Sequence, residues 1–376
     1  METKPAALSV VLFLTALICG CGGGNATFTG GGGPPTAPTI STATGGQTGA
    51  QNGAVIVTLS AASGTTIYYT VDGSTPTSSS QPYLAPFLVA SNLTVNAIAV
   101  ASGQSSTVTT QNFSPNIASN QVVWSEEFTN STGSPAQPNP AIWTYDTGNS
   151  GFGNHELETY CAWGSNTSPC STTSPSEFVG TDGVLHIVAQ QPSAGVYTSA
   201  RLKTQGLFSF QYGRIEIRAA VPEAQGFWPA AWLLGNNIAT VNWPACGEQD
   251  VLERVNAAQT PDWNESSIHG TGFTGGTGLG ADYFFPSGQN ASQWHTYAMA
   301  WAQGHVTYYV DGHPVPPGFN TASISGLPGA VWPFDDGQSN FILLNLAIGG
   351  DFPGPPDNTT PFPAEMLVDY VRIYSN

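Results

Sequence analysis

Three carboxylates lie close together in the run Glu248-Gln249-Asp250-Val251-Leu252-Glu253. If this run is a β-strand, alternate side chains share one face of the sheet, so Glu248 and Asp250 point the same way. Glu253 is out of phase by one residue, and a β-bulge after Asp250 would return it to that face. Like charges on one face repel one another, which should raise the pKa of at least one carboxyl group.

The spacing of these carboxylates suits the cleavage of a glycosidic bond with retention of configuration. That reaction uses one carboxylate as nucleophile and one protonated carboxyl group as general acid, roughly 5–5.5 Å apart. Glu248 and Glu253 on one strand face would meet this separation, and Asp250 could hydrogen-bond the nucleophile and keep the two titrations apart. Taken alone, the run is equally consistent with an acidic strand face that is exposed to solvent or that holds a metal ion.

The composition restricts the partners that such a site could serve. The chain of 376 residues has 7 Lys and Arg against 24 Asp and Glu, and its formal net charge is −17. A nucleic-acid partner needs a basic surface, so we expect none, and an anionic polymer would be repelled, which favours a neutral substrate. The 10 Trp and 13 Tyr could line a sugar-binding cleft, although aromatic side chains mostly fill the core of a β-rich protein.

The first 21 residues are typical of an export signal. Lys4 supplies a weak positive charge, and Ala6–Ile18 is an apolar run too short to span a bilayer. Cys21 follows in a pattern that resembles a bacterial lipobox, so we expect its lipidation; Cys19 is atypical there, and cleavage without lipid is the alternative. We therefore expect an exported monomer, either a cell-envelope lipoprotein or extracellular, that meets the membrane only through this anchor.

The other cysteines suit an oxidising compartment. Cys161 and Cys170 lie in one turn-rich stretch and could close a small loop by a disulfide, which would persist only under oxidising conditions. Cys246 has no obvious partner, and we expect it to be a buried, apolar side chain.

Alternating residue patterns predict an all-β chain in two parts. A Gly- and Pro-rich linker over residues 22–38 precedes a small β-sandwich over residues 39–115, whose expected strands are Val55–Leu59, Thr66–Thr70 and Leu93–Val100. A short polar linker leads to residues 121–376, whose expected strands are Tyr212–Arg218, Trp294–Trp301, Val306–Val310, Phe341–Ile348 and Met366–Tyr374. This larger part is long enough for one two-layer sandwich with a concave face.

The small sandwich contains the stretch Thr66-Ile67-Tyr68-Tyr69-Thr70-Val71-Asp72-Gly73-Ser74-Thr75-Pro76-Thr77. This stretch resembles the accessory domain found at the C-terminus of chitobiases and in many secreted carbohydrases. The resemblance implies a small immunoglobulin-like β-sandwich. The unit has no acid pair or metal cluster, so we expect it to act as a spacer, with weak carbohydrate contact as the alternative.

The larger part carries several motifs in order along the chain. They are Trp124–Phe128, Asn154–Leu157, Thr198–Thr204, Tyr212–Arg214, Gly226–Gly235, Trp243–Glu248, Ile268–Gly270, Leu344–Gly350 and Val368–Arg372. Together they resemble glycoside hydrolase family 16, in particular its bacterial laminarinase-like endo-β-1,3-glucanases, from Val122 to Asn376. The resemblance implies a β-jelly-roll (concanavalin-like) sandwich with an open cleft across its concave sheet.

This resemblance implies a role for each carboxylate: Glu248 is the nucleophile, Glu253 the acid/base and Asp250 their helper. The two-residue gap between Asp250 and Glu253 is the bulged form, which goes with laminarinases and several other branches of the family. Gln249 is a departure, because the family usually has an apolar residue there. Its side chain should point to the buried face, where it needs a hydrogen-bond partner.

The resemblance also implies residues that hold the substrate. Trp228 and Trp232 match cleft tryptophans that stack on sugar rings, and His269 matches a histidine near the cleavage point. Asn154 and Arg201 match polar residues that hydrogen-bond sugar hydroxyls. For each of the five, packing or hydrogen bonding within the scaffold is the alternative.

Relatives in this family often bind a structural calcium ion far from the acids. The matching positions are Glu127 and Gly183 through main-chain oxygens and Asp369 through its carboxylate, which are the hard ligands that calcium prefers. No cofactor is expected for the chemistry itself.

The leading functional hypothesis is endo-hydrolysis, by double displacement, of a neutral β-1,3-glucan such as laminarin or of a mixed β-1,3/1,4-glucan. A galactan substrate such as agar, or dominant transglycosylation, is an alternative within the family, although the low basic content argues against a sulfated galactan. A non-catalytic sugar-binding protein is the alternative from another class. Inactive relatives usually lose one of the acids, whereas this chain retains Glu248, Asp250 and Glu253.

Overall fold

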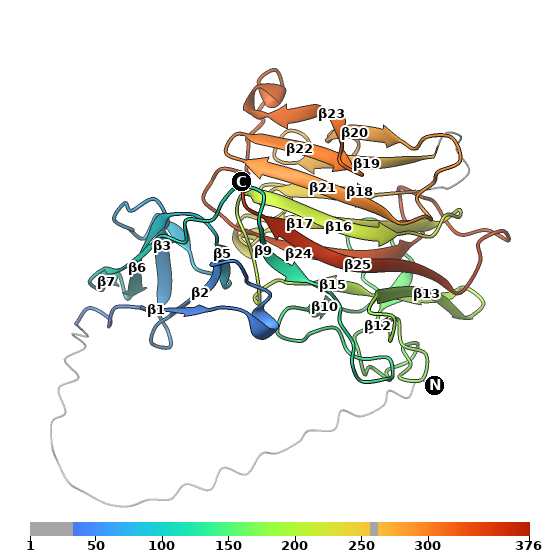
Figure 1. Ribbon diagram of the computed structural model, residues 1–376, viewed down its shortest axis with the longest axis horizontal. Coiled ribbons are helices and arrows are strands. Elements are labelled where there is room, and N and C mark those ends of the chain that lie inside the picture. Colours follow the sequence, from blue (N-terminus) through green and yellow to red (C-terminus); the bar gives the residue numbers. More distant parts are fainter. Residues whose placement is uncertain (1–32, 256–261) are drawn as a thin grey trace, which may run out of the picture. The chain divides into compact units, whose positions relative to one another are not determined.

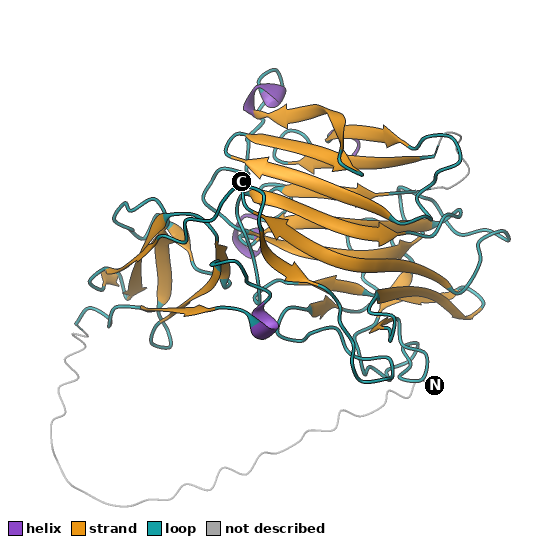
Figure 2. Ribbon diagram, viewed as in Figure 1, coloured by secondary structure: helices purple, strands orange, loops and turns teal. Residues whose placement is uncertain are grey.

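The computed structural model describes residues 33–255 and 262–376. The predicted export signal with Cys19 and Cys21, and residues 22–32 of the predicted linker, lie outside the described residues. Strands dominate (Figure 2), and the helical segments are short: α1 (Ile238–Val241) and the 3-10 turns η1 (Gly46–Thr48), η2 (Gly275–Thr277) and η3 (Thr321–Ile324). No helix in the described part of the chain is long and apolar enough to cross a membrane.

The small N-terminal part is built from two sheets. One runs in the order β1 (Thr39–Ala43), β2 (Val55–Ser60), β5 (Phe87–Val89). The other runs β4 (Gln81–Pro82), β3 (Thr66–Thr70), β6 (Leu93–Ala101), β7 (Gln104–Ser105), with β8 (Thr109–Phe113) paired to β6. Val57 and Val89 from the first sheet pack with Tyr69 and Val95 from the second, so the two sheets share one apolar core.

The larger part contains a seven-stranded antiparallel sheet and a ten-stranded sheet (Figure 1). The seven-stranded sheet runs β10 (Thr144–Asp146), β15 (Arg201–Lys203), β24 (Asn340–Ile348), β17 (Phe227–Gly235), β18 (Glu248–Glu253), β19 (Trp263–His269), β20 (Leu279–Phe284). The ten-stranded sheet runs β11 (Glu158–Tyr160), β14 (Val196–Ser199), β13 (Leu185–Ser193), β25 (Ala364–Tyr374), β16 (Gly213–Ala220), β21 (His295–Ala302), β22 (His305–Val310), β23 (His313–Asn320). β12 (Glu177–Val179) pairs with β13, and β9 (Val122–Glu126) pairs with β25.

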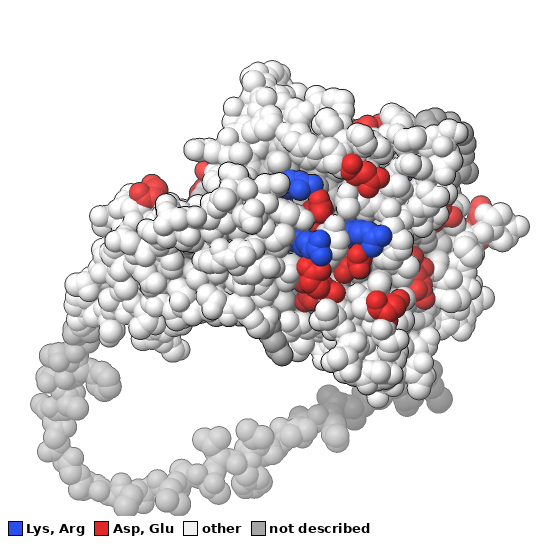
Figure 3. Space-filling model, in the orientation of Figure 1, with Lys and Arg blue, Asp and Glu red and all other residues white. Residues whose placement is uncertain are grey.

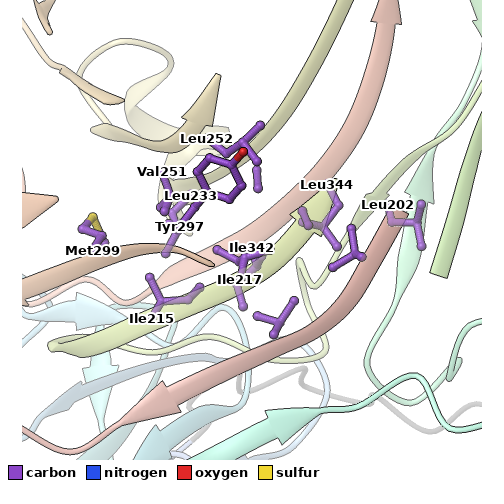
Figure 4. Close-up of a cluster of buried hydrophobic side chains, with 14 of the residues drawn as sticks. Leu202, Ile215, Ile217, Leu233, Val251, Leu252, Tyr297, Met299, Ile342 and Leu344 are labelled. Atoms are coloured by element: carbon purple, nitrogen blue, oxygen red, sulfur yellow. The ribbon is translucent and has the colours of Figure 1, made fainter. Parts of the chain in front are cut away.

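The two large sheets enclose one hydrophobic core. Strands β16 and β21 place alternate residues in it, among them Ile215, Ile217 and Met299, because side chains of a strand alternate between its faces. These pack with residues of the seven-stranded sheet such as Leu233 and Ile342 (Figure 4). Complete burial of one such side chain stabilises the fold by about 1.5–3 kcal/mol. The all-β class and the two-layer sandwich predicted from the sequence are confirmed.

The strands predicted from the sequence are all present, each within two residues of its predicted ends. β24 was expected to be central from its continuous apolar run, and each of its residues is buried between β15 and β17. The expected hairpin turn after Val310 consists of Asp311 and Gly312, both with positive φ, as a tight two-residue hairpin requires. The predicted disulfide between Cys161 and Cys170 is also present, with a Cα–Cα distance of 5.7 Å.

The small sandwich contributes to the core of the larger one. Trp124 of β9 is fully buried, and its Nε1 donates a hydrogen bond of 2.7 Å to the main-chain oxygen of Thr48. The Trp124 ring stacks on the ring of Phe208, with 4.2 Å between the ring centres. The main chain of Trp124 also forms an isolated β-bridge with Ala50 of the small sandwich. Residues Pro34–Asn376 accordingly form one compact unit. The small sandwich therefore supports the larger fold, a role that the expectation of a spacer did not include.

Candidate active site

Strand β18 carries the three carboxylates, and a β-bulge sets their direction. On β17, Trp232 pairs with Asp250 while the preceding Ala231 pairs with Leu252, so Val251 is one residue too many for regular pairing. The register against β19 shifts over the same interval, between Asp250 and Glu253. Val251 and Leu252 both lie in the core, at 1% and 0% exposure. Glu253 thereby returns to the face of Asp250, which confirms the bulge predicted from the sequence.

Gln249 points to the opposite, buried face of β18. Its side chain is 0% exposed, and its Oε1 accepts a hydrogen bond of 3.0 Å from Nδ2 of Asn340 on β24. The predicted need for a partner in the core is therefore met for the carbonyl oxygen, while Nε2 of Gln249 is buried without one.

Asp250 shares a hydrogen-bond network with Ser267 and His269 of β19, and Glu248 lies next to this network. Nε2 of His269 lies 3.2 Å from Oδ2 of Asp250 and 3.8 Å from Oε1 of Glu248. The hydroxyl of Ser267 donates to the same Asp250 oxygen at 2.6 Å. One ligand atom of each of Glu248, Asp250 and His269 lies within 4.8 Å of the others. A Cβ at Gly278 would lie 2.3 Å from Cε1 of His269, so only glycine lets the chain pass so close to the ring.

Each of the two glutamates receives a hydrogen bond from an indole. Nε1 of Trp243 donates to Oε2 of Glu248 at 2.8 Å, and Nε1 of Trp228 donates to Oε1 of Glu253 at 2.8 Å. Trp228 lies on β17 beside β18, whereas Trp243 lies in the loop before β18 and is 45% exposed. An indole N–H can donate but not accept, so both rings fix the direction of a carboxylate oxygen.

The surroundings of the two glutamates raise the pKa of both carboxyl groups. Burial and the charge of Asp250 raise the pKa of Glu248 to about 8, while His269 and the Trp243 N–H oppose this rise. Burial and the charges of Asp250 and Glu265 raise the pKa of Glu253 well above its usual value. Burial disfavours a charged imidazole, but the hydrogen bond to Asp250 and the nearby carboxylates raise the pKa of His269 to about 9. Both glutamates therefore hold a proton more readily than an exposed glutamate does.

The remaining predicted substrate residues are partly engaged with the scaffold. The guanidinium of Arg201 lies 4.7 Å from the centre of the Trp232 ring and 5.1 Å from that of Phe152, and its Nε donates to Asp146 at 3.1 Å. Nε1 of Trp232 donates to Asn345 at 2.7 Å. Arg201 therefore covers part of the Trp232 ring, and the ring also packs against an apolar cluster that includes Phe341 and Leu343.

Asn154 lies in the loop before β11. Its Nδ2 donates to Oε1 of Glu156 at 3.2 Å, and its main-chain oxygen accepts from the main chain of Asp351 at 2.8 Å. The side-chain amide of Asn154 is thus held by the scaffold through its Nδ2 atom.

The positions predicted for calcium meet at one edge of β25. This edge pairs with β13 through Val368 and with β9 from Val371, so Asp369 lies at the junction between them. Gly183 precedes β13 and Glu127 follows β9, so both residues lie near this junction, and main-chain oxygens are ligands that calcium accepts.

The carboxylates near this junction already have cationic partners. Oδ2 of Asp369 accepts from Arg218 at 2.6 Å, and the carboxylate of Glu127 accepts two hydrogen bonds of 2.8 Å from Arg372. Figure 3 shows these charges gathered on the face of the molecule formed by β16 and β25. A calcium ion would compete with Arg218 for Asp369, and calcium binding stays a prediction.

Sequence reasoning did not single out several residues on the acid-bearing face. Trp243 and Ser267 hydrogen-bond the acids directly, and Asn345 holds Trp232. Two of them carry a signal in the sequence: Ser267 shares a strand face with His269 two residues later, and Asn345 is a polar residue inside the apolar run of β24.

Family models match both parts of the chain. The model described as Glycosyl hydrolases family 16 matches residues 165–330, and the model described as Chitobiase/beta-hexosaminidase C-terminal domain matches residues 46–111.

Curated relatives and solved structures resemble the larger part. A beta-glucanase of Rhodothermus marinus is 35% identical over 268 residues, which cover 68% of this chain and 85% of that protein. Glucan endo-1,3-beta-glucosidase A1 of Niallia circulans is 32% identical over 69% of this chain but only 38% of its own length. The laminarinase catalytic domain of Thermotoga maritima has 37% sequence identity and a TM-score of 0.59, and the match covers 69% of this chain and 99% of that domain.

Proposed function

Because the chain belongs to glycosyl hydrolase family 16, we propose that it is a retaining endo-glycosidase of neutral β-glucan, either β-1,3-linked of the laminarin type or mixed β-1,3/1,4-linked. The observation that carries the proposal is the bulged strand β18, which presents Glu248, Asp250 and Glu253 on one face. The beta-glucanase and laminarinase among the relatives support the choice of substrate.

The first step forms a covalent intermediate on Glu248. Its ionised carboxylate attacks the anomeric carbon, while Glu253 gives its proton to the glycosidic oxygen. The bond between the anomeric carbon and that oxygen breaks, and the sugar on the leaving side departs with a hydroxyl group. The surroundings of Glu253 suit the role of proton donor, because burial and the charges of Asp250 and Glu265 raise its pKa well above the usual value.

The second step returns the enzyme to its starting state. Glu253, now ionised, takes a proton from a water molecule whose oxygen attacks the anomeric carbon, and the ester bond to Glu248 breaks. Two inversions at one carbon give net retention. During both steps, Trp243 and Trp228 hold the two carboxylates in direction, and His269 and Ser267 fix the position of the Asp250 carboxyl group beside them.

Sugar contacts are proposed for the residues that surround the acids. Trp228 and Trp232 would stack on sugar rings, while Asn154, Arg201 and His269 would hydrogen-bond hydroxyl groups. The net charge of −17 favours an uncharged glucan over a sulfated polymer.

We also propose that the protein is exported and held at the membrane by a lipid anchor. The N-terminal pattern supports an exported, lipid-anchored protein, with Cys21 as the lipidated residue, that acts as a monomer. Metabolic labelling with palmitate in a bacterial host should mark the wild type but not Cys21→Ala, and equal labelling of both would contradict the anchor.

The proposed activity is tested with purified protein on laminarin, curdlan and lichenan, with agarose as the galactan control. We expect new reducing ends, products of several lengths, and the β-anomer as the first product in NMR spectra. Glu248→Gln should abolish turnover without lowering the melting temperature, whereas Glu365→Gln on the far sheet should retain full activity. Cleavage of agarose alone, or α-anomers as the first product, would contradict the proposal.

A further inference from the structure

A further acid, the half-buried Glu265, lies beside the proton donor. Glu265 of β19 pairs directly with Glu253 of β18, and Asp282 of β20 pairs directly with Glu265. Directly opposite residues in antiparallel strands share a face, with Cβ atoms about 4.5–5.5 Å apart. Ser267 and His269 lie on the same face of β19 as Glu265, so Glu265 is part of the acid-bearing face.

The groups that face Glu253 are almost all acidic. Trp228 of β17 donates its N–H, Glu248 and Asp250 lie on the same strand, and Glu265 lies opposite, with Asp282 behind it. The one cation among them, His269, is held by Asp250 and Glu248 at 3.2 and 3.8 Å. Among the described residues, neither Glu265 nor Asp282 takes part in a salt bridge.

We propose that Glu265 is a positioning residue that keeps the catalytic proton on Glu253. This inference rests on the proposed function, because it concerns the acid/base of that reaction. An ionised carboxylate directly opposite Glu253 makes ionisation of Glu253 unfavourable, since two like charges would then face each other on adjacent strands. The charge of Glu265 is accordingly one of the causes, after burial and Asp250, that raise the pKa of Glu253.

The same charge serves both steps of the reaction. Before the first step it holds the proton that the leaving oxygen will receive. In the glycosyl-enzyme intermediate Glu248 is an ester and has lost its charge, so Glu253 loses one negative neighbour. Glu265 keeps its own charge, which leaves Glu253 a strong enough base to take a proton from water.

The row of acids Glu253, Glu265 and Asp282 across β18, β19 and β20 does not stabilise the sheet. Like charges directly opposite each other destabilise a sheet, and burial raises the pKa of Glu265 itself, with Asp282 adding to the rise. A neutral side chain of the same shape would fit without that repulsion. Glu265→Gln should therefore leave the melting temperature unchanged or raise it.

The pH dependence of kcat/KM on laminarin tests the proposal. In Glu265→Gln the alkaline limb, which reports deprotonation of Glu253, should move to lower pH by about one unit. Glu265→Asp, which keeps the charge, should restore most of this shift. Asp282→Asn, one strand farther from Glu253, should move the limb by less than half as much. An alkaline limb that stays in place in Glu265→Gln, or that moves equally in Glu265→Asp, would overturn the proposal.

A measurement without substrate separates this inference from the proposed function. Carboxyl titration by NMR of 13C-Glu-labelled protein, with Glu253→Gln to assign the resonance, reports the Glu253 pKa directly. We expect a lower pKa in Glu265→Gln than in the wild type, even if no glucan proves to be a substrate. An equal pKa in both proteins would refute the role of Glu265 while leaving the glycosidase activity intact.

Discussion

The hydrogen bond from Trp243 to Glu248 gives a sharp prediction for the nucleophile. Trp243→Phe keeps an aromatic ring but removes the N–H that lies 2.8 Å from Oε2. A hydrogen bond to a charged group contributes about 1.5–3 kcal/mol when buried. Trp243 is 45% exposed, so water partly replaces the donor and we expect a loss of about 1 kcal/mol. That loss corresponds to roughly a fivefold lower kcat/KM at neutral pH.

The sign of the pH effect follows from the same contact. The N–H lowers the pKa of Glu248, so its removal should raise that pKa by about 0.7 unit and move the acid limb of kcat/KM to higher pH. The assay is reducing-end release from laminarin across the pH range, with melting temperatures measured in parallel. Trp294→Phe, which changes a half-exposed indole stacked on Arg218 of the other sheet, is the matched control. An acid limb that does not move in Trp243→Phe would refute the reasoning.

Three further outcomes are expected. Gln249→Leu leaves Nδ2 of Asn340 buried without its acceptor and should cost about 1–3 kcal/mol in urea unfolding, whereas the double change with Asn340→Leu should cost less. Gly49→Ala would place a Cβ 2.5 Å from the main-chain oxygen of Ser125 at positive φ, so the melting temperature should fall; no change would mean that the two sandwiches are not packed together in solution. If calcium binds at β25, EDTA should lower the melting temperature and added calcium should restore it, while an unchanged value would remove the ion from the account.

The geometry of the three acids could be predicted from a local signal, whereas the role of each acid came from the resemblance of the surrounding motifs to the family. Glu248, Asp250 and Glu253 lie within one strand, and the period-two rule alone required a bulge between the last two. The buried direction of Gln249 followed from the same rule. The strands of both sandwiches could be predicted for a similar reason, since alternation and apolar runs are visible within each segment.

Contacts between distant segments could not be predicted in this way. Glu265 faces Glu253 only because β18 and β19 adopt one register, and the pattern within either strand does not fix that register. Arg201 of β15 likewise lies over Trp232 of β17, although β24 separates these two strands in the sheet. The hydrogen bond from Trp124 to Thr48 depends on how the two sandwiches pack together, and the residue pattern within a strand does not predict that packing.

The most direct test of the central claim is to trap the covalent intermediate. A 2-deoxy-2-fluoro-laminaribiosyl fluoride should inactivate the protein, and peptide mass spectrometry should find the added sugar on Glu248 alone. Glu253→Gln should still accept the label, because fluoride departs without a proton. A label on Asp250 or Glu253, or inactivation with no covalent adduct, would contradict the assignment of Glu248 as the nucleophile.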